Sequence, residues 1–309
     1  MVIGGIFLHM CIRNFIILLT LFFSQLLLAD DLNDYKYENY KASAVEVSFN
    51  SILPKMRAEM YDGKEISGLM YKPDGSGPFE SVVMLHGAGG IFPYQLDWAR
   101  QLRDEGYVVL FVDSYCKRKL LCEHDSADND PKRRKAVNRW KEITPPQRGA
   151  DAFGAFEYLI QQNFVKKDKI SLMGFSWGAT AGMISIDPRF FSPSKGGFHS
   201  LVAVYPNSRY WKEMRMWRRI TDVNITIPTL MLAGEKDEAE SIDVYKELQQ
   251  LAEKNMYPLT VILYPDSYRK FDEKREKHSV TVNNITLTKA YNKKAHEDSI
   301  KQVLSFLSN

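Results

Sequence analysis

The sequence predicts an α/β fold in which a mainly parallel central sheet is flanked by helices on both faces. Two observations lead to this prediction. Short apolar runs typical of buried strands alternate with helical patterns along most of the chain, and a glycine-flanked serine directly follows one of these strands. The 309 residues, 45% of them hydrophobic, suffice for one large domain. Because no internal repeat or low-complexity linker divides the chain, we expect a single domain over residues 45–309.

The strand and helix patterns follow each other in a regular order. We expect strands at residues 45–49, 66–71, 81–85, 107–112, 169–173, 201–204, 229–233 and 259–263, and helices at 95–105, 148–162, 179–186, 239–255 and 291–307. Strands that alternate with helices need crossover connections, which make the sheet mainly parallel. Between them, residues 114–145 form a polar, charged and irregular segment.

The N-terminus has the pattern of a signal peptide over residues 1–29, followed by a polar leader over residues 30–44. Residues 15–29 carry no charge, Arg13 precedes them, and Ala29 stands before two aspartates as a plausible cleavage point. The apolar run is short for a membrane-spanning helix, which needs about 20 residues. We therefore expect export to the periplasm or the exterior and no stable membrane insertion after cleavage. The open alternative is an uncleaved signal that anchors the protein in a membrane, and Met10 competes with Met1 as the start.

Charge and cysteine content limit the classes of partner. The net charge of +3 gives no general case for binding nucleic acid. Cys116 and Cys122 lie in one loop of the mature chain, where they either form a disulfide in an oxidising compartment or remain thiols. No second pair of ligands accompanies them, so we predict no metal site. The sequence leaves the oligomeric state open.

The segment Gly174-Phe175-Ser176-Trp177-Gly178 places a serine between an apolar strand and a helix of small residues. A sharp strand-to-helix turn of this kind exposes the serine as a nucleophile, and the amides of the following helix favour a developing oxyanion. In such an architecture, the backbone N–H groups of Ala88 and Trp177 form the oxyanion hole. The alternative is a turn that uses its glycines only for packing. His86, at a strand end, suits a structural role in the Ala88 loop better than that of a base.

Several motifs together resemble those of the dienelactone hydrolase family within the α/β-hydrolase superfamily, most closely its secreted branch. The resemblance runs from about Val45 to Leu307. Its motifs are Pro78–Gly87, Val112-Asp113-Ser114-Tyr115, Arg148–Ala152, Gly174–Gly178, Tyr205-Pro206 and Tyr264–Tyr268. The resemblance implies an α/β-hydrolase fold and hydrolysis of a small carboxylic ester or lactone through an acyl-enzyme on Ser176. It implies no metal and no organic cofactor.

A nucleophilic serine of this kind works in a triad with a histidine base and an acid. The sequence offers a clear candidate for the acid and none at the expected position of the base. Asp237 follows the strand at 229–233, where the family places its acid, although it could instead cap the next helix. Glu235 and Glu238 are weaker candidates. In the family a Tyr-His-Gly-Phe-like stretch carries the histidine, and here Arg269 occupies that position. Arginine stays protonated, so it cannot act as a general base.

Two hypotheses follow from this replacement. In the first, His278 supplies the base, because it follows Asp237 in the expected order and lies in a polar segment that could fold back over the site; the alternative is an exposed loop histidine. In the second, the protein is an impaired or inactive homologue in which Arg269 binds a small anion, since arginine binds carboxylates in a bidentate manner. Nearby cations could contribute to such a site: Lys270, Arg215, Arg218 and Arg219. The segment 210–220 is either a lid over the pocket or an amphipathic surface helix.

Overall fold

The computed structural model describes residues 43–52, 63–122, 142–189, 191, 196–206, 220–255, 257–282 and 285–309. The predicted signal peptide, residues 30–42 of the leader and residues 210–219 of the candidate lid lie outside these ranges.

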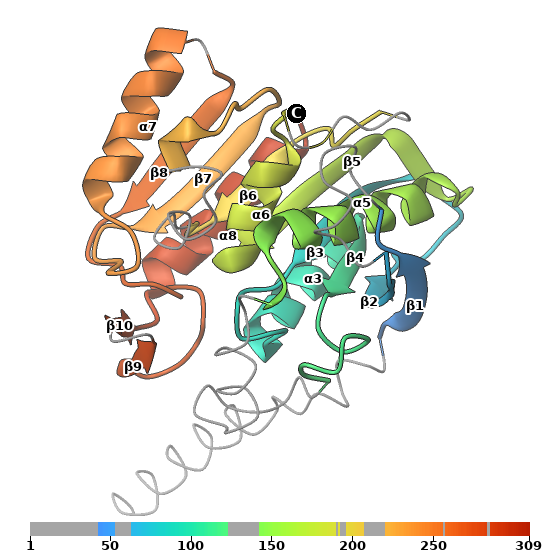
Figure 1. Ribbon diagram of the computed structural model, residues 1–309, viewed down its shortest axis with the longest axis horizontal. Helices are drawn as coiled ribbons and strands as arrows, with labels where there is room; N and C mark the ends of the chain where they lie inside the picture. The colour runs from blue at the N-terminus through green and yellow to red at the C-terminus, as the bar shows by residue number, and fades with distance from the viewer. Residues whose placement is uncertain are drawn as a thin grey trace, which may run out of the picture.

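An eight-stranded sheet forms the centre of the molecule (Figure 1). Its strands lie in the order β1-β2-β4-β3-β5-β6-β7-β8. They are β1 (Val45–Asn50), β2 (Glu65–Tyr71), β3 (Phe79–Leu85), β4 (Val108–Asp113), β5 (Val165–Phe175), β6 (Leu201–Val204), β7 (Thr229–Gly234) and β8 (Leu259–Tyr264). The β1–β2 and β2–β4 pairs are antiparallel and all others are parallel. The predicted fold class, an α/β fold with a mainly parallel sheet, is therefore confirmed.

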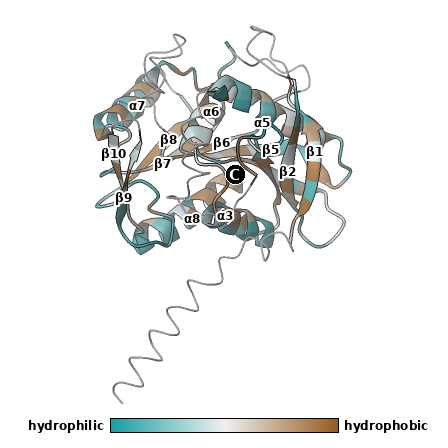
Figure 2. Ribbon diagram, turned by 60° about the horizontal axis from the view of Figure 1, so that its bottom comes forward, coloured by the Kyte–Doolittle hydropathy of each residue, from teal (hydrophilic) through white to brown (hydrophobic). Residues whose placement is uncertain are grey.

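Helices cover both faces of this sheet (Figure 2). On one face lie α5 (Pro145–Ile160), α6 (Trp177–Ser185) and α7 (Ile242–Asn255), and on the other lie α3 (Pro93–Asp104) and α8 (Lys293–Leu307). Strand β3 shows why both faces need cover. Its Val83 and Leu85 join one buried cluster, and Val82 and Met84 join the other. A strand buried on both faces reads as a continuous apolar run, as this one does.

The start of α5 differs from the prediction by three residues. We expected the helix from Arg148, but it begins at Pro145 because Thr144 caps it. The Thr144 hydroxyl accepts the Gln147 N–H, and the Gln147 amide oxygen accepts the Thr144 N–H at 2.8 Å. Proline at the first helical position is compatible with such a cap, because it lacks an N–H that the helix would leave unpaired.

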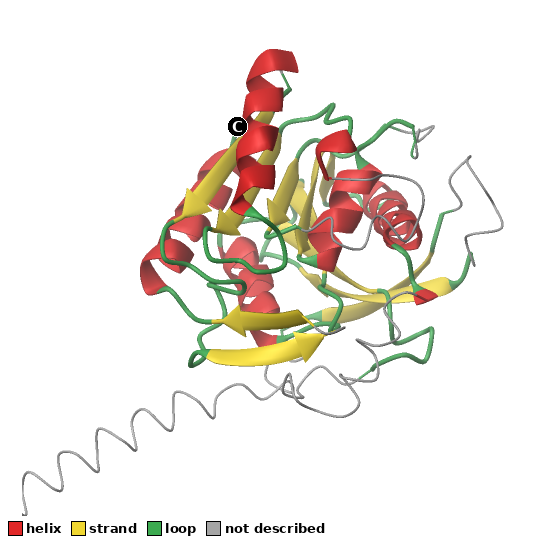
Figure 3. Ribbon diagram, turned by 60° about the vertical axis from the view of Figure 1, so that its left-hand side comes forward, coloured by secondary structure: helices red, strands yellow, loops and turns green. Residues whose placement is uncertain are grey.

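A hairpin follows the central sheet where we expected a polar segment that could fold back over the site. Strands β9 (His278–Val282) and β10 (Ile285–Lys289) pair antiparallel and stand apart from the eight-stranded sheet (Figures 1 and 3). An isolated bridge between Lys289 and Arg269 joins β10 to the segment after β8. Within the described ranges, no helix is both long enough and apolar enough to cross a membrane.

Candidate active site

Ser176 stands on a sharp turn between β5 and α6. Its backbone adopts φ 55° and ψ −116°, a left-handed conformation that a serine rarely takes. A Cβ added at Gly174 would collide with the carbonyl of Gly178, and one added at Gly178 would collide with the carbonyl of Leu85. The two glycines therefore permit the close approach of strand and helix that holds Ser176 in its strained conformation.

The guanidinium group of Arg269 lies between Ser176 and Asp237. Its Nη2 donates to the Ser176 Oγ at 2.7 Å, and its Nη1 donates to the Asp237 Oδ2 at 2.6 Å. Nη2 also donates to the carbonyl of Tyr205 at 2.8 Å. The side chains of Arg269 and Asp237 are 5% and 0% exposed. Arginine thus makes the two contacts, to nucleophile and acid, that an imidazole makes in a serine triad.

Asp237 lies in the loop between β7 and α7, as predicted for the acid. Its Oδ1 accepts the N–H of Ala239 at 2.8 Å, so both carboxylate oxygens have partners. Helix α7 begins only at Ile242, so this bond closes a turn within the loop and does not cap the helix. The weaker candidates have other positions: Glu235 is exposed, and the Glu238 carboxylate binds the N–H and hydroxyl of Thr288 on β10.

The charge of Arg269 is fixed by its surroundings. Burial is the largest effect and lowers the pKa of the guanidinium, but the charge and hydrogen bond of Asp237 together with Tyr245 and Tyr205 outweigh it and hold that pKa above its usual value. A group that stays protonated donates hydrogen bonds but accepts no proton. Arg269 can therefore orient the Ser176 hydroxyl and stabilise negative charge on its oxygen, and it cannot remove the hydroxyl proton.

His278, the predicted base, lies on the hairpin that a bridge from Lys289 links to Arg269. His278 is the first residue of β9, where it pairs with Lys289, and its Nδ1 hydrogen-bonds to the carbonyl of Glu276 at 2.9 Å. The two groups that a base would have to join, Ser176 and Asp237, are joined by Arg269 instead. The role of His278 as a relocated base therefore stays a prediction.

Other histidines occupy structural positions. His86 is fully buried; its Nδ1 contacts the carbonyl of Gly87 at 2.6 Å, and its Nε2 accepts the Ser114 N–H at 3.3 Å. These bonds fit the role of holding its loop. His296 on α8 is 7% exposed and packs against the Trp98 ring. Burial lowers its pKa to about 4.

The loop after β3 lies beside the nucleophile, where the oxyanion prediction requires it. A Cβ at Gly87 would lie 3.5 Å from the Ser176 Cβ, which shows how close the backbone passes. Trp177 begins α6, so its N–H belongs to the first turn, whose N–H groups have no acceptor within the helix itself. The Tyr115 hydroxyl donates to the Ala88 carbonyl at 3.0 Å and so fixes the peptide after Ala88. The assignment of the Ala88 and Trp177 amides to an oxyanion hole stays a prediction.

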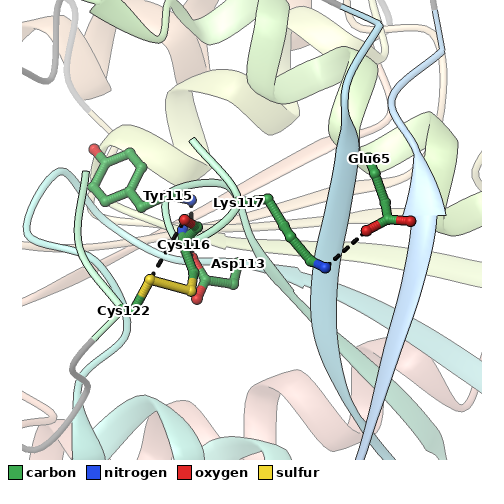
Figure 4. Close-up of a disulfide and its surroundings, with 6 residues drawn as sticks. All are labelled: Glu65, Asp113, Tyr115, Cys116, Lys117 and Cys122. Carbon is green, nitrogen blue, oxygen red and sulfur yellow. Dashed lines mark hydrogen bonds and ion pairs between the residues drawn. A yellow bond between two sulfur atoms is a disulfide. The ribbon is translucent and has the colours of Figure 1, made fainter. Parts of the chain in front are cut away.

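A disulfide between Cys116 and Cys122 adjoins Tyr115 (Figure 4). Of the two alternatives left open by the sequence, a disulfide or two free thiols, the structure therefore has the disulfide. The Asp113 carboxylate at the end of β4 accepts the N–H groups of Tyr115 and Cys116 at 2.8 and 3.0 Å. The disulfide loop is therefore anchored at the sheet edge that carries Ala88.

Sequence reasoning missed the part that Tyr205 plays at this site. Its backbone is also left-handed, with φ 41°, and its carbonyl accepts from Arg269 while its ring lies 5.2 Å from the guanidinium carbon. Its hydroxyl contacts the Asp272 carboxylate and the Tyr94 hydroxyl, each at 3.1 Å, and Trp98 Nε1 donates to Asp272 at 3.0 Å. Burial raises the pKa of Asp272 to about 6. The one signal in the sequence was the Tyr205-Pro206 motif.

The ammonium group of Lys270 has a carboxylate and an aromatic ring as neighbours. Its ammonium lies 3.0 Å from the Glu273 carboxylate and 3.7 Å from the centroid of the Phe92 ring. The other predicted cations, Arg215, Arg218 and Arg219, lie outside the described residues. Among the residues that are described, no three His, Cys, Asp or Glu side chains gather closely enough to hold a metal ion.

Comparison with known proteins gives one family and many structural neighbours. Residues 66–309 match the model of the dienelactone hydrolase family. A curated relative, the uncharacterized peptidase YtmA of Bacillus subtilis, is 25% identical over 244 residues, which are 71% of this chain and 87% of that protein.

Solved structures share the fold at low sequence identity. A candidate dienelactone hydrolase from Klebsiella pneumoniae has a TM-score of 0.63 and 16% identity, over 86% of this chain and 99% of its own. The dienelactone hydrolase-like promiscuous phosphotriesterase P91 from metagenomic libraries has a TM-score of 0.59 and 15% identity, over 86% and 98% of the chains. Thermogutta terrifontis esterase 2, phosphorylated by paraoxon, has a TM-score of 0.55 and 13% identity, over 84% and 93%.

Proposed function

The chain belongs to the dienelactone hydrolase family, and on that premise we propose that it is a serine hydrolase of carboxylic esters or lactones in which Arg269 takes the place of the histidine. Ser176 attacks the carbonyl carbon, and the backbone amides of Ala88 and Trp177 bind the oxyanion. The observation that supports this function is the guanidinium bridge, which keeps nucleophile and acid in one hydrogen-bonded unit.

The chemistry of arginine limits which substrates such a site can use. The guanidinium stabilises the alkoxide form of Ser176 electrostatically, so the hydroxyl proton passes to solvent. Arg269 does not release a proton to a leaving group, because its pKa is held above its usual value. We therefore propose that the substrates are activated esters or lactones, such as aryl or enol esters, whose leaving group departs as a stable anion.

Two neighbours support the use of phosphorus electrophiles as probes of this serine. One is described as phosphorylated by paraoxon and another as a promiscuous phosphotriesterase. We propose that Ser176 reacts with such electrophiles in the same way. The signal-peptide pattern and the disulfide support the further proposal that the mature protein works outside the cytoplasm, where disulfides persist.

A second candidate function is binding of a small carboxylate without turnover. The same observation favours it, since a buried cation stands beside Ser176 and no described imidazole contacts that serine. In this reading the carboxylate would accept from Arg269 and from the predicted oxyanion amides.

Labelling with a fluorophosphonate probe separates the two functions. We expect the wild-type protein to be labelled and Ser176→Ala to remain unlabelled. Arg269→His, which restores the family residue, should raise hydrolysis of p-nitrophenyl acetate by at least about 10²-fold, the usual effect of a general base. Arg103→His, on the far end of α3 and paired with exposed Asp104, is the control and should change nothing. A folded wild type that takes no label would favour the binding function.

A further inference from the structure

We propose that the acyl-enzyme on Ser176 is long-lived, so that the protein captures one acyl group per chain and releases it slowly. This inference rests on the proposed function, because it requires Ser176 to react with an activated ester. It concerns what happens after that reaction, and it follows from the difference between the two half-reactions at a site built around Arg269.

Acylation suits the site. A bond forms between Ser176 Oγ and the carbonyl carbon, and the bond from that carbon to the aryl or enol oxygen breaks. The leaving group carries away the electron pair as a stable anion, and the serine proton goes to solvent. Arg269 Nη2, which donates to Oγ at 2.7 Å, stabilises the negative charge that develops on the attacking oxygen.

Deacylation is the difficult half. A water oxygen must now bond to the acyl carbon, and the bond from that carbon to Oγ must break. The leaving group is the Ser176 alkoxide, a far stronger base than a phenolate, and the water needs a proton acceptor. In the described part of the chain, the side chain that hydrogen-bonds to Ser176 Oγ is Arg269, which accepts no proton.

Asp237 does not replace the missing acceptor. Its side chain is fully buried, and its two oxygens are occupied by Arg269 and by the N–H of Ala239. Arg269, by contrast, remains compatible with the acylated serine, because an ester oxygen accepts the same N–H that the hydroxyl oxygen accepts. The contacts therefore tolerate the covalent product and provide no described group that activates water against it.

The experiment follows release of p-nitrophenolate and the intact mass of the protein after mixing with excess p-nitrophenyl acetate. We expect a burst of about one p-nitrophenolate per chain, a mass increase of one acetyl group, and a slow steady phase. The adduct should be absent from Ser176→Ala and unchanged in the control Arg103→His. In Arg269→His the lifetime of the adduct should fall by at least about 10²-fold, because the imidazole activates water.

The outcomes separate this inference from the proposed function. Steady turnover without a burst or an adduct would overturn the long-lived acyl-enzyme and leave the hydrolase standing. If the protein shows no burst and no turnover, both the long-lived acyl-enzyme and the proposed function are contradicted. If Arg269→His fails to fold, the wild-type adduct decides alone: its rate of loss should rise about tenfold per pH unit between pH 7 and 9, as attack by hydroxide requires. A plateau near pH 7 would reveal a histidine base and contradict the inference.

Discussion

Arg269 differs from the histidine of the family in charge as well as in shape. A neutral imidazole beside Asp237 becomes charged only when it takes the serine proton, whereas Arg269 and Asp237 form a buried ion pair. Removing one partner of such a pair strongly destabilises a protein, because the other charge is left buried and unpaired. Asp237 therefore has a structural reason to be present whether or not Ser176 reacts, and its position alone is no proof of catalysis.

Asp272 allows a prediction at the scale of one residue. Its folded pKa of about 6 lies above the ordinary value of 3.8, so the native protein binds its proton more tightly than the unfolded chain does. Asp272 should accordingly contribute a fall in stability of at most about 3 kcal/mol as pH rises from about 4 to 6. His296, whose pKa is lowered to about 4, contributes an opposite rise over the same range, so the contribution of Asp272 is the difference between wild type and the Asp272→Asn variant. Asp272→Asn should remove this dependence, as measured by urea unfolding at a series of pH values.

The geometry suggests that Asn is tolerated at position 272. Its amide oxygen can accept from Trp98 Nε1, and its NH₂ can donate to the Tyr205 hydroxyl, which then donates to Tyr94. Asp298→Asn, on the part-exposed side of α8, is a matched control that should keep the pH dependence. An unchanged pH dependence in Asp272→Asn would show that another group is responsible.

The β9–β10 hairpin supports a prediction at the scale of an element. Glu238, the residue after the acid, holds β10 through the N–H and hydroxyl of Thr288 at 2.6 and 2.8 Å. Glu238→Ala should loosen the hairpin locally by about 1 kcal/mol, because one charged acceptor serves both bonds. Hydrogen exchange at the Thr288 amide should accelerate, whereas Glu253→Ala on the exposed side of α7 should leave it unchanged. Equal protection of the Thr288 amide from exchange in both variants would contradict the role of Glu238 in holding β10.

Elements with strong local patterns were predictable from the sequence, and those fixed by distant contacts were not. The apolar run of β3 and the glycine-flanked turn at Ser176 each carry their own signal, so both appeared where expected. The β9–β10 hairpin has short strands of Val and Thr and is held by Glu238 and Arg269, which are remote in sequence. The contacts of Arg269 with Ser176 and Asp237 could not be predicted either. The sequence shows that arginine replaces the histidine, but it does not show which groups the arginine side chain contacts.

At the scale of the whole molecule, the site is an edge of the parallel sheet. Ala88 follows β3, Ser176 follows β5, Tyr205 follows β6, Asp237 follows β7 and Arg269 follows β8. The carboxyl ends of parallel strands meet at one edge, which is where ligands bind in open α/β sheets. Arg269 joins three of these loops by direct hydrogen bonds. It therefore holds the loops at this sheet edge together in addition to contacting the nucleophile.

The last prediction concerns the form in which the whole chain exists. A cleaved signal peptide should leave a mature protein that begins at Asp30, and oxidation should join Cys116 to Cys122. Expression of the full chain in an exporting host, followed by intact mass measurement, tests both, since the disulfide removes two hydrogens. Reduction should lower stability by about 2 kcal/mol, because the disulfide closes only a short loop in the unfolded chain. A chain that keeps residues 1–29 and stays with the membrane fraction would instead establish the uncleaved anchor, and the hydrolase domain would then act tethered to a membrane surface.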